Sequence, residues 1–169
     1  MTIYNGVDYV NEEIYRILSG VTDPEVPVLT IIDLGIIRGV SVNAPDSSIS
    51  VLITPTYSGC PAMDVISIGI RMALAGSGYR KINISEQISP AWTTDWMTTE
   101  GKRKLEEYGI APPNRKAFKD LELFEEEEVS CPRCKSKETI LVSRFGPTSC
   151  KALYKCTNCA EPFEHFKCH

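Results

Sequence analysis

Two pairs of cysteines near the C-terminus constrain the fold of this chain more than any other feature. The chain has 169 residues and seven Cys, and six of the seven fall in the last 39 residues. Four of them form two C-x-x-C motifs, Cys131–Cys134 and Cys156–Cys159, with 21 residues between the motifs. Each motif turns two thiolates toward one ion, and two such motifs joined by a β-hairpin complete a tetrahedral site of four sulfurs. Because the intervening Thr139–Ser143 is β-prone, we predict a zinc ribbon.

The metal of this ribbon is expected to be structural zinc, which supplies folding energy to a module that is too short to form a large core of its own. The spacing of the motifs leaves rubredoxin-like iron or a cluster open. The N-terminus has no signal-peptide pattern and no run reaches 18 apolar residues, so we expect a cytoplasmic protein without a transmembrane helix. Thiols stay reduced in that compartment, which favours metal ligation over disulfides.

Charge divides the chain into two parts. The formal net charge of −4 excludes a strongly basic nucleic-acid binder as the default interpretation. Residues 1–128 carry 11 basic and 19 acidic side chains, a net charge of −8, whereas residues 129–169 carry 7 basic and 3 acidic side chains, a net charge of +4. We therefore expect an acidic first domain at 1–113, an acidic linker at 114–128 that ends in four Glu, and a basic ribbon at 129–169.

The first domain has the pattern of an α+β protein. Apolar residues at steps of three and four predict a helix over 7–19, and two alternating runs, 36–42 and 48–54, predict a β-hairpin. A helix over 61–75 is apolar on most sides, so we expect it to be well buried, and a third strand follows at 81–88. The order is α-β-β-α-β, a small sandwich of helices on a sheet. A further helix is expected over 92–108, with Gly109 as its C-terminal cap.

Cys60 is the one thiol of the first domain. If Pro61 is the first residue of its helix, Cys60 is the N-cap, where the helix dipole and free N–H groups favour thiolate over thiol. A reactive or metal-binding Cys and a small buried Cys both fit this position. An enzyme is not expected, because neither His lies in this domain to act as a base for Cys60, although an Asp or Glu partner stays open. The sequence also contains neither a di-iron Glu-x-x-His pair nor a Gly-x-Gly-x-x-Gly motif.

Short motifs around Cys60 resemble the domain of SufT-like and Cia-type iron–sulfur assembly factors. They are Asp23-Pro24-Glu25, Asp33-Leu34-Gly35, Thr54 and Cys60-Pro61, in that order. The resemblance implies an α+β domain in which a single reactive Cys assists the assembly or transfer of a cluster into client proteins. It assigns the motif positions to this chain as Asp23, Glu25, Asp33, Thr54 and Cys60.

Longer motifs resemble the D-subunit family of the bacterial phenylacetyl-CoA epoxidase system, also called PaaD or PaaJ. These motifs lie at residues 89–97, 108–113, 145–154 and 161–169, so the resemblance covers nearly the whole chain. It implies a maturation or accessory factor for the di-iron oxygenase subunit or the [2Fe–2S] reductase subunit of that system. Cys150, Cys168 and His169 lie inside the matched motifs, which makes them candidates for additional metal ligands.

Three hypotheses follow for the function of the chain. The first is a factor that transiently holds iron or an iron–sulfur cluster on Cys60, alone or together with Asp33 or the terminal thiols. It passes the cargo to a client by thiolate exchange, with oxygenase, reductase or other iron–sulfur proteins as partners. The second is a non-catalytic structural subunit of the epoxidase complex. The third is a zinc-ribbon nucleic-acid module, which the basic tail favours and the acidic first domain disfavours. A homodimer is open as well, since a small sheet leaves an edge strand that can pair.

Overall fold

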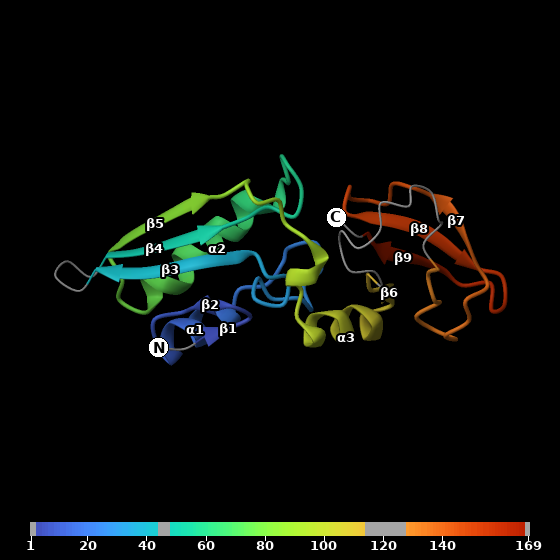
Figure 1. Cartoon of the computed structure of the whole chain (residues 1–169), viewed down its shortest axis with the longest axis horizontal. Coiled ribbons are helices and arrows are strands. Elements are labelled where there is room, and N and C mark those ends of the chain that lie inside the picture. The colour runs from blue at the N-terminus through green and yellow to red at the C-terminus, as the bar shows by residue number, and fades with distance from the viewer. Residues whose placement is uncertain (1–2, 44–47, 114–127, 168–169) are drawn as a thin grey trace. The chain divides into compact units, whose positions relative to one another are not determined.

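The computed structural model describes residues 3–43, 48–113 and 128–167. The chain forms two compact units (Figure 1). The first comprises Met1–Trp92 and Trp96–Thr98, and the second comprises Thr93–Asp95 and Thr99–His169. In the described part of the chain, no helix is long and apolar enough to cross a bilayer.

The first unit is built on a three-stranded sheet. The strands are β3 (Ile37–Asn43), β4 (Ser48–Ile53) and β5 (Lys81–Glu86), in the order β3-β4-β5. β3 is antiparallel to β4 and β4 is parallel to β5, so the chain crosses back through α2 (Ala62–Gly76) between them (Figure 1). Burial alternates along β4, and its inward-facing side chains Ile49, Val51 and Ile53 have no exposed surface. The expected α+β fold and its α-β-β-α-β order are confirmed.

The first helix begins later than the sequence pattern predicted. Residues 3–8 form a short antiparallel pair, β1 (Ile3–Tyr4) and β2 (Val7–Asp8), and α1 follows at Glu12–Ser19. The side chain of Asn11 caps α1 by accepting a hydrogen bond of 2.9 Å from the backbone N–H of Ile14. Val7 is buried as predicted, but it is buried from a strand and not from a helix.

The burial expected for the second helix was wrong on one side. α2 buries Ala62, Met63, Ile66, Ile70 and Leu74, which lie on its face toward the sheet. Val65, Ile68 and Met72 are 54%, 57% and 71% exposed. A helix on one side of a three-stranded sheet has only one face to bury, so apolar composition overstates its burial.

The second unit is built on a four-stranded sheet with the order β6-β9-β8-β7. Its strands are β6 (Ile110–Ala111), β7 (Thr139–Ser143), β8 (Lys151–Cys156) and β9 (Pro162–Phe166). β7, β8 and β9 form an antiparallel meander, and β7 and β8 are the hairpin expected between the two cysteine motifs.

The helix predicted over 92–108 divides into two elements. A single 3₁₀ turn, η2 (Thr94–Trp96), precedes α3 (Thr99–Tyr108), and Gly109 follows with φ +93°. β6 pairs in parallel with β9, so the stretch from 99 to 111 packs with the C-terminal unit. The compact units therefore divide earlier in the chain than the predicted domain boundary at residue 113.

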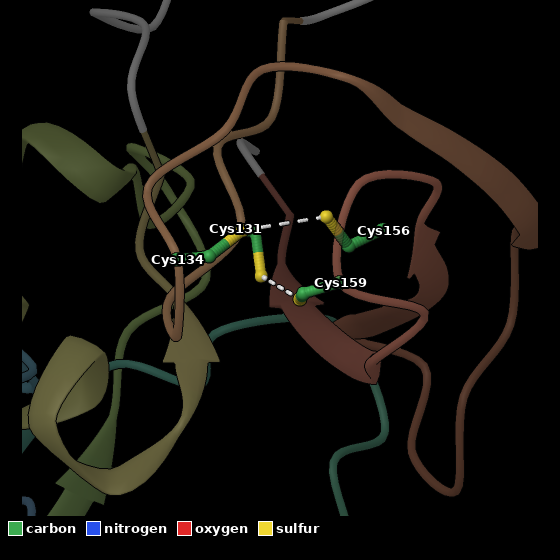
Figure 2. Close-up of side chains that lie close together, drawn as sticks. All are labelled: Cys131, Cys134, Cys156 and Cys159. Atoms are coloured by element: carbon green, nitrogen blue, oxygen red, sulfur yellow. Dashed lines mark hydrogen bonds between the residues drawn. The ribbon is translucent and has the colours of Figure 1, made fainter.

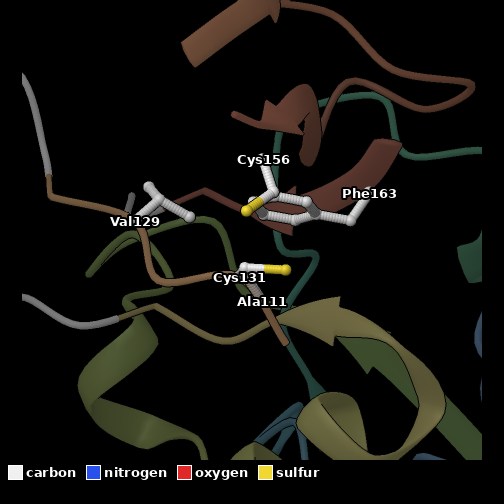
Figure 3. Close-up of a cluster of buried hydrophobic side chains, with 5 residues drawn as sticks. All are labelled: Ala111, Val129, Cys131, Cys156 and Phe163. Atoms are coloured by element: carbon white, nitrogen blue, oxygen red, sulfur yellow. The ribbon is translucent and has the colours of Figure 1, made fainter. Parts of the chain in front are cut away.

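A small core holds the second unit together. It consists of Ala111, Val129, Cys131, Cys156 and Phe163, all at most 5% exposed (Figure 3). The Tyr154 ring stacks on Phe163 with their centroids 5.9 Å apart, beside this core. Two of the five core residues are cysteines, so the packing of this unit depends directly on the state of their thiols.

Candidate functional site

The four cysteines of the two C-x-x-C motifs converge on one point (Figure 2). The sulfurs of Cys131, Cys134, Cys156 and Cys159 all lie within 4.8 Å of one another. The Sγ–Sγ distance is 3.8 Å between Cys131 and Cys159 and 3.6 Å between Cys134 and Cys156. Sulfurs on a tetrahedral zinc with bonds of about 2.3 Å stand about 3.8 Å apart, whereas a disulfide requires about 2.05 Å. The arrangement fits a four-coordinate metal ion and not a pair of disulfides.

The two motifs adopt the same backbone conformation. The first cysteine of each donates its N–H to the carbonyl five residues later, from Cys131 to Ser136 at 2.9 Å and from Cys156 to Glu161 at 2.8 Å. The residue after the second cysteine has a positive φ in both motifs, +63° at Lys135 and +62° at Ala160. Two equivalent turns thus present one thiol pair each, as a closed four-sulfur site requires.

A backbone donor biases one of the four thiols toward the thiolate form that binds a metal. A backbone hydrogen bond from Ser136 lowers the pKa of Cys134 to about 6. Glu161 makes the matching backbone bond at Cys159, but burial and the three neighbouring sulfurs outweigh it and raise the pKa of Cys159 to about 12. Four thiolates within 4.8 Å of one another would repel each other. A divalent cation removes this conflict, because it neutralises the repulsion among the thiolates.

Ion pairs connect the first motif to its surroundings. Arg133 contacts Glu161, two residues beyond the second motif, with an N–O distance of 2.5 Å. Lys135 contacts Glu106 of α3 at 2.6 Å. Both pairs are solvent-exposed, so each contributes little stability and mainly orients the motif.

Cys150, the described one of the remaining C-terminal candidates, is not part of the four-cysteine group. Cys150 is buried, its Sγ is 3.1 Å from the hydroxyl of Thr148, and its carbonyl accepts a hydrogen bond from the Lys167 N–H. Cys168 and His169 lie outside the described residues. The buried His165, which the sequence did not single out, places Nδ1 3.1 Å from the Ala111 carbonyl and joins β9 to β6. The sequence signal for the burial of His165 was its position two residues after Phe163, on the same face of β9.

Cys60 lies at the end of the loop that connects β4 to α2. The structure places the N-cap at Pro61, one residue later than expected, and α2 begins at Ala62. The Cys60 N–H donates to the Tyr57 carbonyl, and the Cys60 carbonyl accepts from the Met63 N–H, both at 3.2 Å. The residue is half-buried, next to the exposed Ser58 and Gly59. Two turns thus fix the backbone of Cys60 while part of the residue stays accessible.

The carboxylates of the assembly-factor motif organise the loops around it. Asp33 is buried, and its carboxylate accepts hydrogen bonds from the N–H and hydroxyl of Thr30 and from the hydroxyl of Thr98, at 2.9–3.1 Å. One oxygen of Asp23 accepts from the N–H groups of Glu25 and Val26, both at 2.8 Å. Each carboxylate thus fixes the backbone of a turn.

Thr54 and Glu25 complete the set of motif residues. Thr54 is 1% exposed and its N–H donates to the Ile36 carbonyl, which ties the end of β4 to the loop before β3. Its hydroxyl has no hydrogen-bond partner within the described ranges. Glu25 is half-buried. Asp23 and Asp33 lie in the 21–36 loop, to which Thr54 is bonded, whereas Cys60 lies in the loop between β4 and α2.

Two tryptophans, which sequence reasoning did not assign to the site, hold the Asp33-Leu34-Gly35 turn. Trp92 Nε1 donates to the Leu34 carbonyl at 2.8 Å. Gly35 has φ +66°, and a Cβ there would lie 2.2 Å from the Trp96 carbonyl oxygen. The Arg38 guanidinium lies 3.7 Å from the centroid of the Trp96 ring. The motif at 89–97 therefore packs on the motif at 33–35, a contact between two segments that are about 60 residues apart in sequence.

Comparison with known proteins places both units in described families. The family model for the PaaD zinc beta ribbon domain matches residues 115–167, and the model for iron–sulfur cluster assembly proteins matches residues 11–85. A protein of Escherichia coli (strain K12), provisionally named as the D-subunit of 1,2-phenylacetyl-CoA epoxidase, is 48% identical over 156 residues, which is 92% of both chains. The chain belongs to the PaaD family.

Other relatives of this PaaD-family chain match a shorter stretch of it. A protein of Porphyromonas gingivalis (strain ATCC BAA-308 / W83), named Fe-S protein maturation auxiliary factor, is 38% identical over 95 residues, 56% of this chain and 89% of that protein. The crystal structure of a DUF59 domain from Bacillus anthracis matches 57% of this chain and 91% of its own length, with a TM-score of 0.52 and 24% identity. That likeness supports the fold of the first unit.

Proposed function

We propose that this PaaD-family chain is an accessory factor that assists the maturation of an iron or iron–sulfur centre in a phenylacetyl-CoA epoxidase system. The observation that carries the proposal is the 48% identity to the E. coli relative, which extends over both units. The match of residues 11–85 to iron–sulfur cluster assembly proteins supports the maturation role. No catalytic step is assigned to the chain itself.

Cys60 is the residue proposed to hold the cargo. Iron or a cluster is bound through the Cys60 thiolate and leaves by ligand exchange, in which a client thiolate or carboxylate forms a bond to iron as the Cys60 bond breaks. The partial exposure of Cys60 at a loop end supports this role, because ligand exchange needs access to the sulfur. Asp23, Asp33, Glu25 and Thr54 are proposed to shape the neighbouring loops, with Glu25 as the carboxylate that the observed turns leave most available.

Zinc is the proposed metal of the four-cysteine site. Cys131, Cys134, Cys156 and Cys159 match its tetrahedral sulfur geometry, and the family model of this region is a zinc ribbon. With all four positions taken by thiolates, the site has no open position for a substrate, so zinc would supply folding energy. Cys150, Cys168 and His169 remain candidates for additional ligands.

The metal content of the client proteins tests the proposal. Cells that contain the epoxidase oxygenase and reductase subunits are given either the unaltered chain or Cys60→Ser, and the client subunits are analysed for iron and acid-labile sulfide. We expect the Cys60→Ser cells to yield clients with several-fold less iron, whereas Ser58→Ala in the same loop has no effect. Equal iron content with Cys60→Ser would overturn the proposal, provided that the variant retains one zinc per chain.

A permanent structural subunit is the second candidate, because the E. coli relative is named as a subunit. This role predicts stable, stoichiometric co-purification with the other subunits. A maturation factor must instead be released. Gel filtration of the native complex separates the two roles: recovery of the chain with the mature complex in equal amounts favours the structural role.

A further inference from the structure

The free edge of the C-terminal sheet has an unusual composition. β7 is the terminal strand in the order β6-β9-β8-β7, so one side of its backbone is unpaired among the described strands. Natural proteins protect such edges with charged side chains or Pro, because an apolar edge strand is a template for pairing with another chain. β7 instead carries three consecutive aliphatic residues, Ile140, Leu141 and Val142, which are 52%, 44% and 55% exposed. A bulge at Val142 bends only the end of the strand.

A cavity of about 830 Å³ adjoins this edge. It lies over the sheet face that carries Leu141, Tyr154 and His165, and Phe145, 70% exposed, lies at its border. This volume is in the range of pockets that take a ligand or a set of side chains. An apolar strand edge is therefore continuous with a hollow whose lining combines aliphatic, aromatic and charged side chains.

Positive charge surrounds the same edge. Lys137, Arg144 and Lys167 line the cavity. Among the described residues the Arg144 guanidinium has no ion-pair partner. The Lys167 ammonium donates a hydrogen bond to the Arg144 carbonyl at 3.2 Å and lies 4.9 Å from the Phe145 ring centroid. Glu128 is the acidic residue of the lining, and it contacts Lys137 at 2.9 Å. The unpaired charge of this region is thus positive, which favours a partner that brings carboxylates.

We propose that β7 and the adjoining cavity are a docking surface for an extended, acidic segment of a partner protein, which adds to the sheet as a further strand. Backbone pairing along Thr139–Leu141 would set the register, an apolar side chain of the segment would enter the cavity, and its carboxylates would contact Arg144 and Lys167. The charge of the surface argues against pairing with the same edge of a second copy of this chain, because two basic edges would repel each other. The inference does not depend on Cys60, which lies in the other unit.

Site-specific photo-crosslinking in cells of the source organism tests the proposal. Benzoylphenylalanine replaces Leu141 in the full chain, and in a control it replaces Met72, which is also apolar and 71% exposed but lies on α2. Crosslinked sites are mapped by mass spectrometry. We expect position 141 to crosslink to a segment of another protein that combines carboxylates with apolar residues. Crosslinks only to a second copy of this chain, or none above the Met72 control, would overturn the proposal.

A synthetic peptide of the crosslinked segment then measures the interaction with the full zinc-containing chain. We expect Arg144→Glu and Leu141→Asp each to weaken binding at least tenfold, Met72→Asp to leave it unchanged, and added salt to weaken it. Equal affinity of all variants would overturn the proposal. One zinc per chain and an unchanged circular dichroism spectrum verify that each variant is folded. If a variant loses peptide binding while its client proteins keep their normal iron content, the docking surface acts independently of the proposed role of Cys60.

Discussion

At the residue scale, Gly35 shows why the Asp33-Leu34-Gly35 motif ends in glycine. Gly35 has φ +66°, and the backbone of Trp96 lies so close to it that a Cβ would not fit. The sequence indicated the motif through its resemblance to assembly factors, but it could not show that the contact is the Trp96 carbonyl, because that contact is between distant segments. Gly35 thus links the loop of Asp33 to the segment that ends the first unit.

Gly35→Ala is expected to destabilise the first unit strongly. The new Cβ would meet Trp96 atoms at 2.2–2.8 Å, so the loop must shift, in addition to about 1–2 kcal/mol for a non-Gly residue with positive φ. Gly78→Ala is the matched control, since Gly78 has φ +95° but nothing within 4 Å of its Cβ position. Thermal unfolding measures both variants. If Gly35→Ala lowers the melting temperature no more than Gly78→Ala does, this result would contradict the observed packing.

Asp33→Asn is expected to lower the free energy of unfolding by about 1–3 kcal/mol, because an amide cannot accept all the hydrogen bonds that the buried carboxylate accepts from Thr30 and Thr98. A double-mutant cycle of Thr98→Val and Asp33→Asn measures how much of this lost free energy of unfolding comes from the hydrogen bond between Thr98 and Asp33. Additive losses in denaturant unfolding would show that the two side chains act independently, against the structure.

At the element scale, the two cysteine turns show how far sequence spacing can specify a site. The C-x-x-C pattern predicted the ligands and the hairpin between them, and the hydrogen bonds and positive φ angles give both turns the same shape. The spacing could not show that Lys135 and Ala160 occupy the left-handed region, because neither is Gly. A side chain there costs stability that the metal site must offset.

Ala160→Gly is therefore expected to stabilise the second unit by up to about 1 kcal/mol. Gly adopts φ +62° without the strain of about 1–2 kcal/mol that a side chain adds there, and this gain exceeds the roughly 0.4–1 kcal/mol that Gly costs through the entropy of the unfolded chain. Thr157→Gly in the same turn provides the contrast, because it removes a hydroxyl that donates to the Glu138 carbonyl at 2.9 Å. Chemical denaturation of the zinc-containing protein measures the free energy of unfolding of both variants. A stabilising Thr157→Gly or a destabilising Ala160→Gly would contradict the assigned turn geometry.

The helices show where periodicity failed. The apolar pattern of residues 7–19 continued through Val7, but the turn at Gly6, with φ +76°, directs Val7 into β2. In α2, apolar residues on the exposed side were indistinguishable in sequence from those on the buried side. Both errors arise from tertiary packing, which decides which apolar residues have a partner.

At the scale of the whole molecule, the two units are stabilised by different means. The first buries aliphatic side chains of a sheet and two helices, whereas the second has a core of five residues, of which two are metal-site cysteines. The division of charge and cysteines in the sequence anticipated two parts. It could not anticipate that α3 and β6 belong with the ribbon, because a two-residue strand such as β6 has no pattern of its own.

Removal of zinc is accordingly expected to unfold the second unit and to leave the first folded. A strong chelator, or a fall in pH that protonates the thiolates, should abolish the amide NMR dispersion of β7–β9 and preserve that of β3–β5. Readdition of zinc at neutral pH should restore the lost signals. Simultaneous loss of both sets of signals, or of neither, would contradict the claim that the metal stabilises the second unit alone.

Direct transfer of iron is the measurement that tests the central claim most closely. The full chain and Cys60→Ser are incubated anaerobically with ferrous iron and sulfide, freed of unbound metal, and mixed with a metal-free client protein, which is then separated and analysed for iron. We predict that the unaltered chain carries iron beyond its one zinc and passes it to the client, and that Cys60→Ser does neither. Iron transfer by Cys60→Ser at the same rate, or no iron bound by the unaltered chain, would contradict the proposed role of Cys60.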